Sequence, residues 1–147
     1  MDLKQVALAC LNDINDLVER TGTKIEVQDL PRARATSDLI SRVFYNLLTN
    51  AIKYGPDDKP PHVVVSAEQA DGMVTIRVAD NGIGIAPESR EKVFQLFHKL
   101  DAGKDRDGNG LGLALCELVI EKCGGSIWVE DNPKGGTIFV FTLLATA

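Results

Sequence analysis

The sequence predicts an α/β (α+β) two-layer sandwich, with one mixed, largely antiparallel sheet and helices packed on one of its faces. Amphipathic helical segments alternate with short β-rich segments along the chain. Two pairs of neighbouring β-rich segments are joined by turn sequences, which favours antiparallel hairpins. No repeat or long linker divides the 147 residues, so we expect a single domain over residues 1–147.

Composition excludes several classes of protein. The chain is 44% hydrophobic and 25% charged, as in an ordinary globular domain, and its net charge of −5 does not suit nucleic-acid binding. No apolar run approaches the length that spans a membrane, and Met1–Lys4 does not begin a signal peptide. The three cysteines (Cys10, Cys116 and Cys123) lie in apolar helical patterns without a CxxC pair, which predicts free thiols in a reducing compartment.

The first half of the chain predicts two helices around a short strand. Apolar residues recur at helical spacing over 3–20, and Gly22 can end that helix. Residues 24–27 alternate as in a strand. A second helix is predicted over about 38–54, with Thr36, Ser37 or Asp38 as its cap, and it ends before Gly55-Pro56.

The middle of the chain predicts a β-hairpin and a short helix. Residues 62–69 and 73–80 alternate as strands, and Asp71-Gly72 between them is a strong hairpin signal. Pro87 and Glu88 begin a short helix through Val93, and we interpret the following Phe94 and Phe97 as core anchors.

The last third predicts a loop, a helix and a final hairpin. Residues 101–110 are polar and glycine-rich, which indicates a mobile loop. The helix over 111–123 is apolar nearly all round, so we expect it to be buried, with Glu117, Glu121 and Lys122 at its solvent edge. Residues 126–130 and 137–143 predict the final strands.

The segment 46–54 combines an apolar stripe with a polar one. At helical spacing, Asn46, Asn50, Lys53 and Tyr54 project to one side, opposite Val43, Phe44, Leu47, Leu48 and Ala51. Amide oxygens can ligate a hard cation and an ammonium group can pair with phosphate, which together suit an anion and its metal ion. A solvated helix face explains the same pattern, and this segment alone leaves both interpretations open.

Two glycine-containing segments add candidates for ligand contact. In the segment Asp80-Asn81-Gly82-Ile83-Gly84-Ile85, a carboxylate at a strand end precedes glycines that allow close backbone approach, although a plain β-turn gives the same pattern. The segment Gly108-Asn109-Gly110-Leu111-Gly112-Leu113 begins a helix and could expose amides to phosphate, or it could be a flexible linker. Lys99, Lys104 and Arg106 flank this second segment as phosphate partners or as solvated charges. His62 and His98 are isolated and predicted at the surface.

Together these pieces resemble the ATP-binding catalytic domain of two-component sensor histidine kinases, in the superfamily that also holds DNA gyrase, the Hsp90 chaperones and MutL. The N box corresponds to 46–54, the two glycine boxes to 80–84 and 108–112, and the phenylalanine box to 94–97. The closing segments 124–128 and 136–141 also resemble kinase members. The resemblance therefore covers nearly the whole chain.

The resemblance implies roles for individual residues with ATP and Mg²⁺ as cofactors. Asn50 would ligate Mg²⁺ and Asn46 would support it, Lys53 would contact phosphate, and Tyr54 would lie against base or sugar. Asp80 would read the adenine amino group, with Thr137 nearby, and Gly82, Gly84 and Ile85 would close on adenine. Gly108, Asn109, Gly110, Leu111, Gly112 and Leu113 would form the lid hinge and phosphate amides. Lys99 stands where an arginine is common, which implies a less directional phosphate contact. Asn109 stands where Thr or Ser is usual, which implies that the cap function is retained.

Within the superfamily, Asn46 favours a kinase over an ATPase. The hydrolytic branches have at this position a glutamate that activates water, whereas an amide cannot take a proton at neutral pH.

The resemblance implies that the γ-phosphoryl group passes to a histidine on a separate dimerisation segment, with a response regulator downstream. Neither His62-Val63 nor His98-Lys99 matches the signature of an acceptor, so we expect an excised catalytic domain that is inactive without the acceptor segment. We expect this domain to be monomeric, cytoplasmic and free of direct membrane contact. An anti-sigma-factor-type serine kinase and a non-catalytic nucleotide-binding module remain alternatives.

Overall fold

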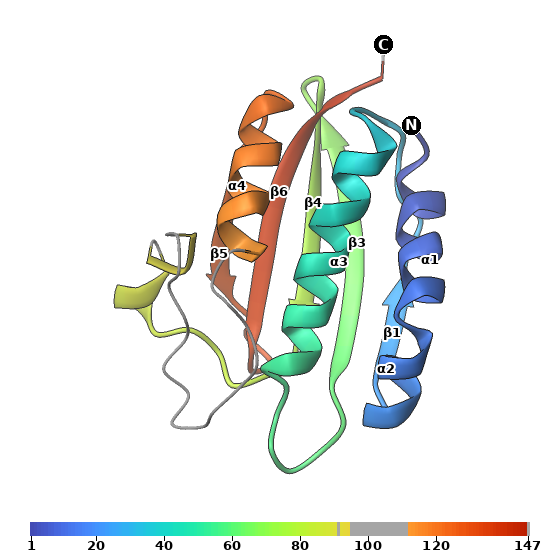
Figure 1. The fold of residues 1–147 in the computed structure, drawn as a ribbon. Coiled ribbons are helices and arrows are strands. Elements are labelled where there is room, and N and C mark those ends of the chain that lie inside the picture. The colour runs from blue at the N-terminus through green and yellow to red at the C-terminus, as the bar shows by residue number, and fades with distance from the viewer. Residues whose placement is uncertain (91, 95–111, 147) are drawn as a thin grey trace.

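The computed structural model describes residues 1–90, 92–94 and 112–146. These residues form the predicted two layers, a sheet with helices on one face (Figure 1). The strands are β1 (Lys24–Val27), β2 (Ala33–Arg34), β3 (His62–Ala70), β4 (Met73–Asp80), β5 (Ile127–Asp131) and β6 (Thr137–Ala145). The helices are α1 (Leu3–Asp13), α2 (Asn15–Thr21), α3 (Ser37–Lys53) and α4 (Gly112–Lys122), with short 3₁₀ turns η1 (Pro87–Ser89) and η2 (Lys92–Phe94).

The sheet is mixed and largely antiparallel, as predicted. Its order in the described part of the chain is β1-β3-β4-β6-β2, and β5 also pairs with β6. The β1–β3 pair is parallel, and every other pair is antiparallel. The β3–β4 hairpin turns at Asp71 and Gly72, which both have positive φ (53° and 78°), as a tight two-residue turn requires.

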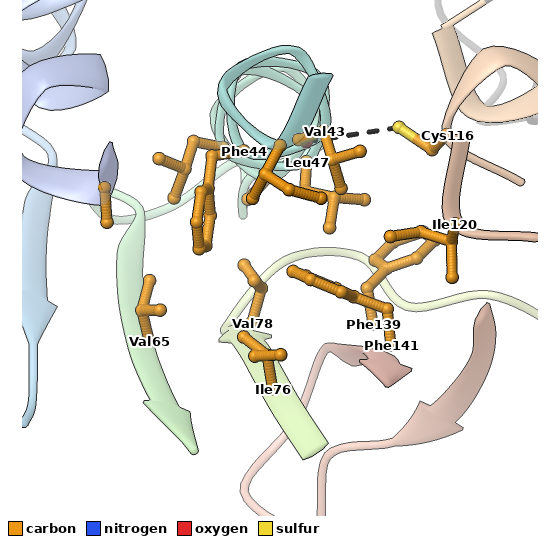
Figure 2. Packing of buried hydrophobic residues seen from close by; sticks show 14 of the residues in the cluster. Val43, Phe44, Leu47, Val65, Ile76, Val78, Cys116, Ile120, Phe139 and Phe141 are labelled. Carbon is orange, nitrogen blue, oxygen red and sulfur yellow. Dashed lines mark hydrogen bonds between the residues drawn. The ribbon is translucent and has the colours of Figure 1, made fainter. Parts of the chain in front are cut away.

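The core lies between the sheet and α3, which crosses the middle of the helical layer. The Phe44 ring packs edge-on against Phe141 with ring centroids 5.8 Å apart. Figure 2 shows α3 side chains pointing at strand residues such as Val65 and Ile76, with Cys116 and Ile120 of α4 closing one side. The predicted anchor Phe94 packs edge-on against Phe139 at 6.2 Å, whereas Phe97 lies outside the described residues.

Three local predictions differ from the structure. The helix predicted over 3–20 breaks at Ile14 (φ −104°, ψ 15°), where the flanking Asn and Asp residues have low helix propensity. Strand β2 is absent from the sequence prediction, because two residues are too few to show periodicity. The predicted helix over 87–93 consists instead of η1 and η2, and residue 91 between them is not described.

The prediction that α4 is buried nearly all round is wrong. Leu115 and Leu118 are 38% and 51% exposed. Helix α4 lies at the margin of the helical layer, so α3 and the sheet cover only part of its surface (Figure 1). The apolar composition of a helix does not reveal how many neighbours it has. Among the described residues, no helix is long and apolar enough to cross a membrane. The predicted mobile loop over 101–110 lies outside the described residues.

Candidate functional site

The candidate site is centred on Asp80, the last residue of β4. Its side chain is buried, with 7% of the residue exposed. One carboxylate oxygen, Oδ1, accepts hydrogen bonds from the backbone N–H groups of Gly82 (2.9 Å) and Thr137 (3.1 Å). The buried Thr137 begins β6, so Asp80 joins two neighbouring strands at one end of the sheet. The orientation of this carboxyl group is therefore fixed by the backbone.

Burial changes the acidity of this group. Desolvation raises the pKa of Asp80 from 3.8 to about 6, although the backbone hydrogen bonds from Gly82 and Thr137 oppose the rise. The second oxygen, Oδ2, makes no hydrogen bond with any described residue. A carboxylate that is held through one oxygen keeps the other as an acceptor for a ligand donor.

Two glycines allow the backbone to close around Asp80. A Cβ atom at position 82 would lie 2.2 Å from the Tyr54 carbonyl oxygen, and one at position 136 would lie 2.2 Å from the Asp80 carbonyl oxygen. Neither position accepts a side chain without movement of the backbone. At Gly84 the backbone has φ +80°, which glycine adopts without strain, and the nearest atom to an added Cβ is 3.8 Å away. Gly82 and Gly84 therefore leave backbone uncovered on either side of Ile83, whose side chain is exposed.

Asn132 is a site component that the sequence did not single out. Its side-chain amide donates a hydrogen bond to the Asp80 carbonyl oxygen at 2.9 Å. Its main-chain carbonyl group accepts from the N–H of Gly135 at 2.8 Å, which tightens the β5–β6 turn. The sequence signal was the Asn-Pro-Lys-Gly-Gly segment, but this composition indicates a turn without indicating what the turn contacts.

The polar face of α3 is as predicted. Asn46, Asn50, Lys53 and Tyr54 are half-buried, and the opposite stripe of Val43, Phe44, Leu47, Leu48 and Ala51 is buried. The C-terminal end of α3 reaches the glycine segment, because the Ile83 N–H donates to the Tyr54 carbonyl oxygen at 3.1 Å. The N box and the first glycine box are thus in direct contact.

Asn46 connects α3 to the start of α4. A Cβ at position 112 would lie 3.0 Å from the Asn46 Oδ1 atom, so the glycine permits a close approach. Asn46 also forms a hydrogen bond with the Cys116 thiol. Burial of this thiol raises its pKa to about 12, although the hydrogen bond with Asn46 acts in the opposite direction. The first residue of α4 therefore lies against the polar face of α3.

The structure thus gathers most of the predicted residues that it describes. Ile85 belongs to the buried core (8% exposed), and Leu113 is partly buried against that core. The remaining predicted positions, Lys99, Gly108, Asn109, Gly110 and Leu111, lie outside the described residues, as do Lys104, Arg106 and His98.

Two further predictions concern residues away from the site. The His62 side chain is 43% exposed, near the surface as predicted, with its Nε2 atom 3.4 Å from the Glu26 Oε1 atom. All three cysteines are free, and Cys10 and Cys116 are buried while Cys123 is half-buried.

The chain matches a known protein family. Residues 35–147 match the model for histidine kinase-, DNA gyrase B- and HSP90-like ATPases, and the chain belongs to that family.

The similar proteins include histidine kinases. The phytochrome-like protein Cph1 of Synechocystis is 36% identical over 142 residues, which are 97% of this chain and 19% of Cph1. The mycobacterial sensor histidine kinase MprB superposes with a TM-score of 0.85 at 28% identity over 98% of this chain and 96% of that one. Full-length ShkA in complex with AMPPNP superposes with a TM-score of 0.84 at 27% identity, over all of this chain and 31% of ShkA. The chain spans about a fifth of the length of Cph1 and a third of ShkA.

Proposed function

We propose that the chain binds ATP with Mg²⁺ and donates the γ-phosphoryl group to a histidine on a separate dimerisation segment. It would act as the catalytic part of a sensor histidine kinase, with a response regulator downstream in two-component signalling. Because ATP is a cytoplasmic metabolite, we propose a cytoplasmic location as well. The observation that carries the proposal is the Asp80 carboxylate, held by two backbone N–H groups and presented beside bare backbone.

The Asp80 end of the site fits an adenine base. The exocyclic amine of adenine is a hydrogen-bond donor, and Oδ2 is an acceptor that no described residue uses. The bare backbone at Gly82 and Gly84 suits the close approach of a flat ring. Tyr54 ends the polar face of α3 next to this segment, which suits a contact with base or sugar.

The α3 end of the site fits phosphates and a metal ion. Asn50 would ligate Mg²⁺ through its amide oxygen, with Asn46 in support one turn earlier, and Lys53 would pair with phosphate. Bound Mg²⁺ would supply neutralisation of the phosphate charge during transfer. Gly112 and Leu113 at the start of α4 would add amides, and Lys99, Gly108, Asn109, Gly110 and Leu111 remain proposed on the family resemblance alone.

Transfer to another protein group is favoured over hydrolysis. The Asn46 amide beside α4 has no basic electron pair with which to deprotonate water. Among the described residues, no carboxylate replaces it on the polar face of α3 (Asn46, Asn50, Lys53 and Tyr54). The chain's own contribution is therefore to bind and orient the nucleotide, while the nucleophile comes from the acceptor segment.

A surface for that segment lies on the outer side of the helical layer. Leu115 and Leu118 lie one turn apart on α4, the helix that begins at the site, and both are exposed. A groove of about 540 Å³ runs beside Leu115, and its lining also includes Asn46 and Tyr45. Exposed apolar side chains in such a cluster are typical of a docking surface. An amphipathic acceptor helix seated here would bring its histidine towards Asn46.

Phosphotransfer can be tested with the acceptor supplied in trans. A two-helix segment carrying a His-Glu pair is incubated with the chain, Mg²⁺ and ATP labelled in its γ-phosphate. We expect acid-labile, alkali-stable label on the segment, little label on the chain alone, and loss of transfer in Asn50→Ala. Asn12→Ala, an exposed helical asparagine on α1, is the matched control.

Each other outcome points to one alternative. Acid-stable label would indicate a serine kinase. Retained ADP binding with an unlabelled segment would indicate a nucleotide-binding module. Steady phosphate release without any segment would indicate an ATPase and would contradict the argument from Asn46.

A further inference from the structure

One side of the β5 backbone is unpaired by any residue that the structure describes. Strand β5 pairs with β6 in an antiparallel register from Ile127↔Phe141 to Asp131↔Thr137. Just before the strand, the Thr142 N–H donates to the Ser126 carbonyl at 2.9 Å, and just after it the Asn132 N–H donates to the Gly136 carbonyl at 3.2 Å. Hydrogen-bonded pairs recur at every second residue of an antiparallel ladder. The even-numbered residues 126–132 therefore point their main-chain groups at β6.

The odd-numbered residues of β5 point the other way. The backbone N–H and C=O groups of Ile127, Val129 and Asp131 face the free edge, and they make no hydrogen bond to any described residue. Such a row of donors and acceptors can pair with another extended chain.

A groove follows this edge. It has a volume of about 650 Å³, and its lining includes the consecutive residues Ile127, Trp128 and Val129. Because successive side chains of a strand point to opposite faces of the sheet, a groove that touches all three must run along the edge itself. The opposite wall comes from the segment with η1 and η2, which lies beyond β5 (Figure 1).

Two side-chain interactions lie along this groove, one at the last residue of β5 and one at Trp128. The Arg90 guanidinium forms an ion pair with Asp131, which ties η1 to the last residue of β5. The Trp128 indole N–H donates to the Glu130 carboxylate at 2.8 Å, which holds a ring that is 37% exposed. The buried Arg90 Nε has no hydrogen-bond partner among the described residues, so an incoming main-chain carbonyl would supply one.

The charges of the groove favour an uncharged occupant. Its ionisable lining residues are two acids and two bases: Glu88, Glu117, Arg90 and Lys92. The remaining lining residues are largely apolar, and they include Phe94 of η2. A strongly charged peptide would find as much repulsion as attraction here. An extended segment with apolar side chains at every second position matches both the walls and the edge.

The other edge of the sheet lacks these features. In β1 the Lys24 ammonium group lies 3.3 Å from the Glu26 carboxylate, which places charged side chains along that edge. Neither the groove beside α3 nor the groove beside β5 has a lining residue from β1.

From these observations we propose that β5 binds an uncharged, extended peptide segment of a partner protein, which adds a strand to the sheet. The partner's main chain pairs with Ile127, Val129 and Asp131, and its inward side chains enter the groove beside Phe94. This surface is separate from Asp80 and from the polar face of α3, so the inference does not rest on the proposed nucleotide function.

The probe is the peptide acetyl-Ser-Val-Thr-Val-Thr-Val-Ser-amide, titrated into the ¹⁵N-labelled full chain. We expect chemical-shift changes and slower hydrogen exchange at the amides of Ile127, Val129 and Asp131. Ile127→Pro removes one outward N–H group without removing a bond to β6, and it should lower affinity at least tenfold.

A matched variant exists on the opposite edge. Lys24 and Gln28 donate their N–H groups to the carbonyl oxygens of Pro61 and Val65, so the N–H of Ile25 points outward from β1. Ile25 and Ile127 are both half-buried. Ile25→Pro should therefore leave peptide affinity unchanged, whereas equal losses in the two variants would contradict the proposal.

Peptide chemistry provides a readout that does not depend on the folding of a variant. N-methylation of the peptide bonds that face β5 should abolish binding, and N-methylation of the alternate bonds should not. The same effect from both series, shifts confined to other surfaces, or no binding at millimolar peptide would overturn the inference. Amide shifts at β5 that grow with chain concentration without peptide would assign the edge to a second copy of this chain instead.

Discussion

Replacing Asp80 by asparagine tests the adenine end of the site with the smallest change of shape. The new amide side chain can keep Oδ1 as the acceptor for the N–H groups of Gly82 and Thr137. The change removes the negative charge and replaces Oδ2 by an NH₂ group. A donor then faces the exocyclic amine of the proposed base, which is itself a donor.

The expected loss of affinity follows from that one contact. A hydrogen bond to a charged group contributes about 1.5–3 kcal/mol. Since about 1.4 kcal/mol corresponds to a factor of ten, ADP binding should weaken by about 10- to 150-fold. Because the new NH₂ group would face the exocyclic amine of adenine, which is also a donor, we expect a loss of ADP affinity towards the upper end of that range.

Asp80→Asn should weaken ADP binding, but it should not lower the free energy of unfolding. A pKa raised from 3.8 to about 6 means that folding disfavours the ionised carboxyl group, by about 3 kcal/mol when it is fully charged. Protonation favours the folded state here, so this group lowers stability progressively as the pH rises from about 4 to about 6. Asp80→Asn removes this cost at neutral pH, and the variant should be at least as stable as the parent chain.

Calorimetry with ADP and Mg²⁺, together with urea unfolding, measures both quantities at pH 7.5. Asp71→Asn is the matched control, because Asp71 is exposed in the β3–β4 turn and asparagine tolerates its positive φ. We expect Asp71→Asn to change neither ADP affinity nor the position of the Asp80 titration. Unchanged ADP affinity in a stable Asp80→Asn chain would refute the assignment of Asp80 to adenine.

Three further predictions follow from the same structure. ADP affinity of the parent chain should fall about tenfold between pH 7 and pH 5, because a protonated Asp80 cannot accept a hydrogen bond at Oδ2, and Asp80→Asn should show no such dependence in calorimetry. Gly136→Ala should destabilise the fold and weaken ADP binding more than Gly135→Ala. The two glycines have nearly equal φ (100° and 99°), but only at position 136 would a Cβ meet the Asp80 carbonyl oxygen, at 2.2 Å. Equal effects of the two variants in unfolding and binding experiments would contradict this close approach. Phe44→Ala should lower the free energy of unfolding by about 3–5 kcal/mol, because the ring is fully buried against Phe141, whereas Ala at the exposed neighbour Tyr45 should change it by less than about 0.5 kcal/mol in urea titrations.

The sequence by itself determined the fold class and the main features of the candidate site. The amphipathic pattern of α3 predicted which side chains are buried, and the structure agrees for every residue of the two stripes. Asp71-Gly72 fixed the β3–β4 hairpin, and the alternation of its strands fixed which face is buried. The position of Asp80 at the end of a strand, before Gly82 and Gly84, also follows from the sequence. These features depend on side-chain periodicity and turn chemistry, which are local properties of the chain.

The tertiary structure decided the features that depend on distant segments. The hydrogen bond from Asn132 to the Asp80 carbonyl joins residues 52 positions apart, and no local pattern indicates it. The exposure of Leu118 follows from the place of α4 at the margin of its layer, although its sequence suits a buried helix. The free edge of β5 exists only because no described strand lies beyond it. Contacts, burial and unpaired edges depend on which distant segments meet in space. A local sequence pattern therefore cannot predict them.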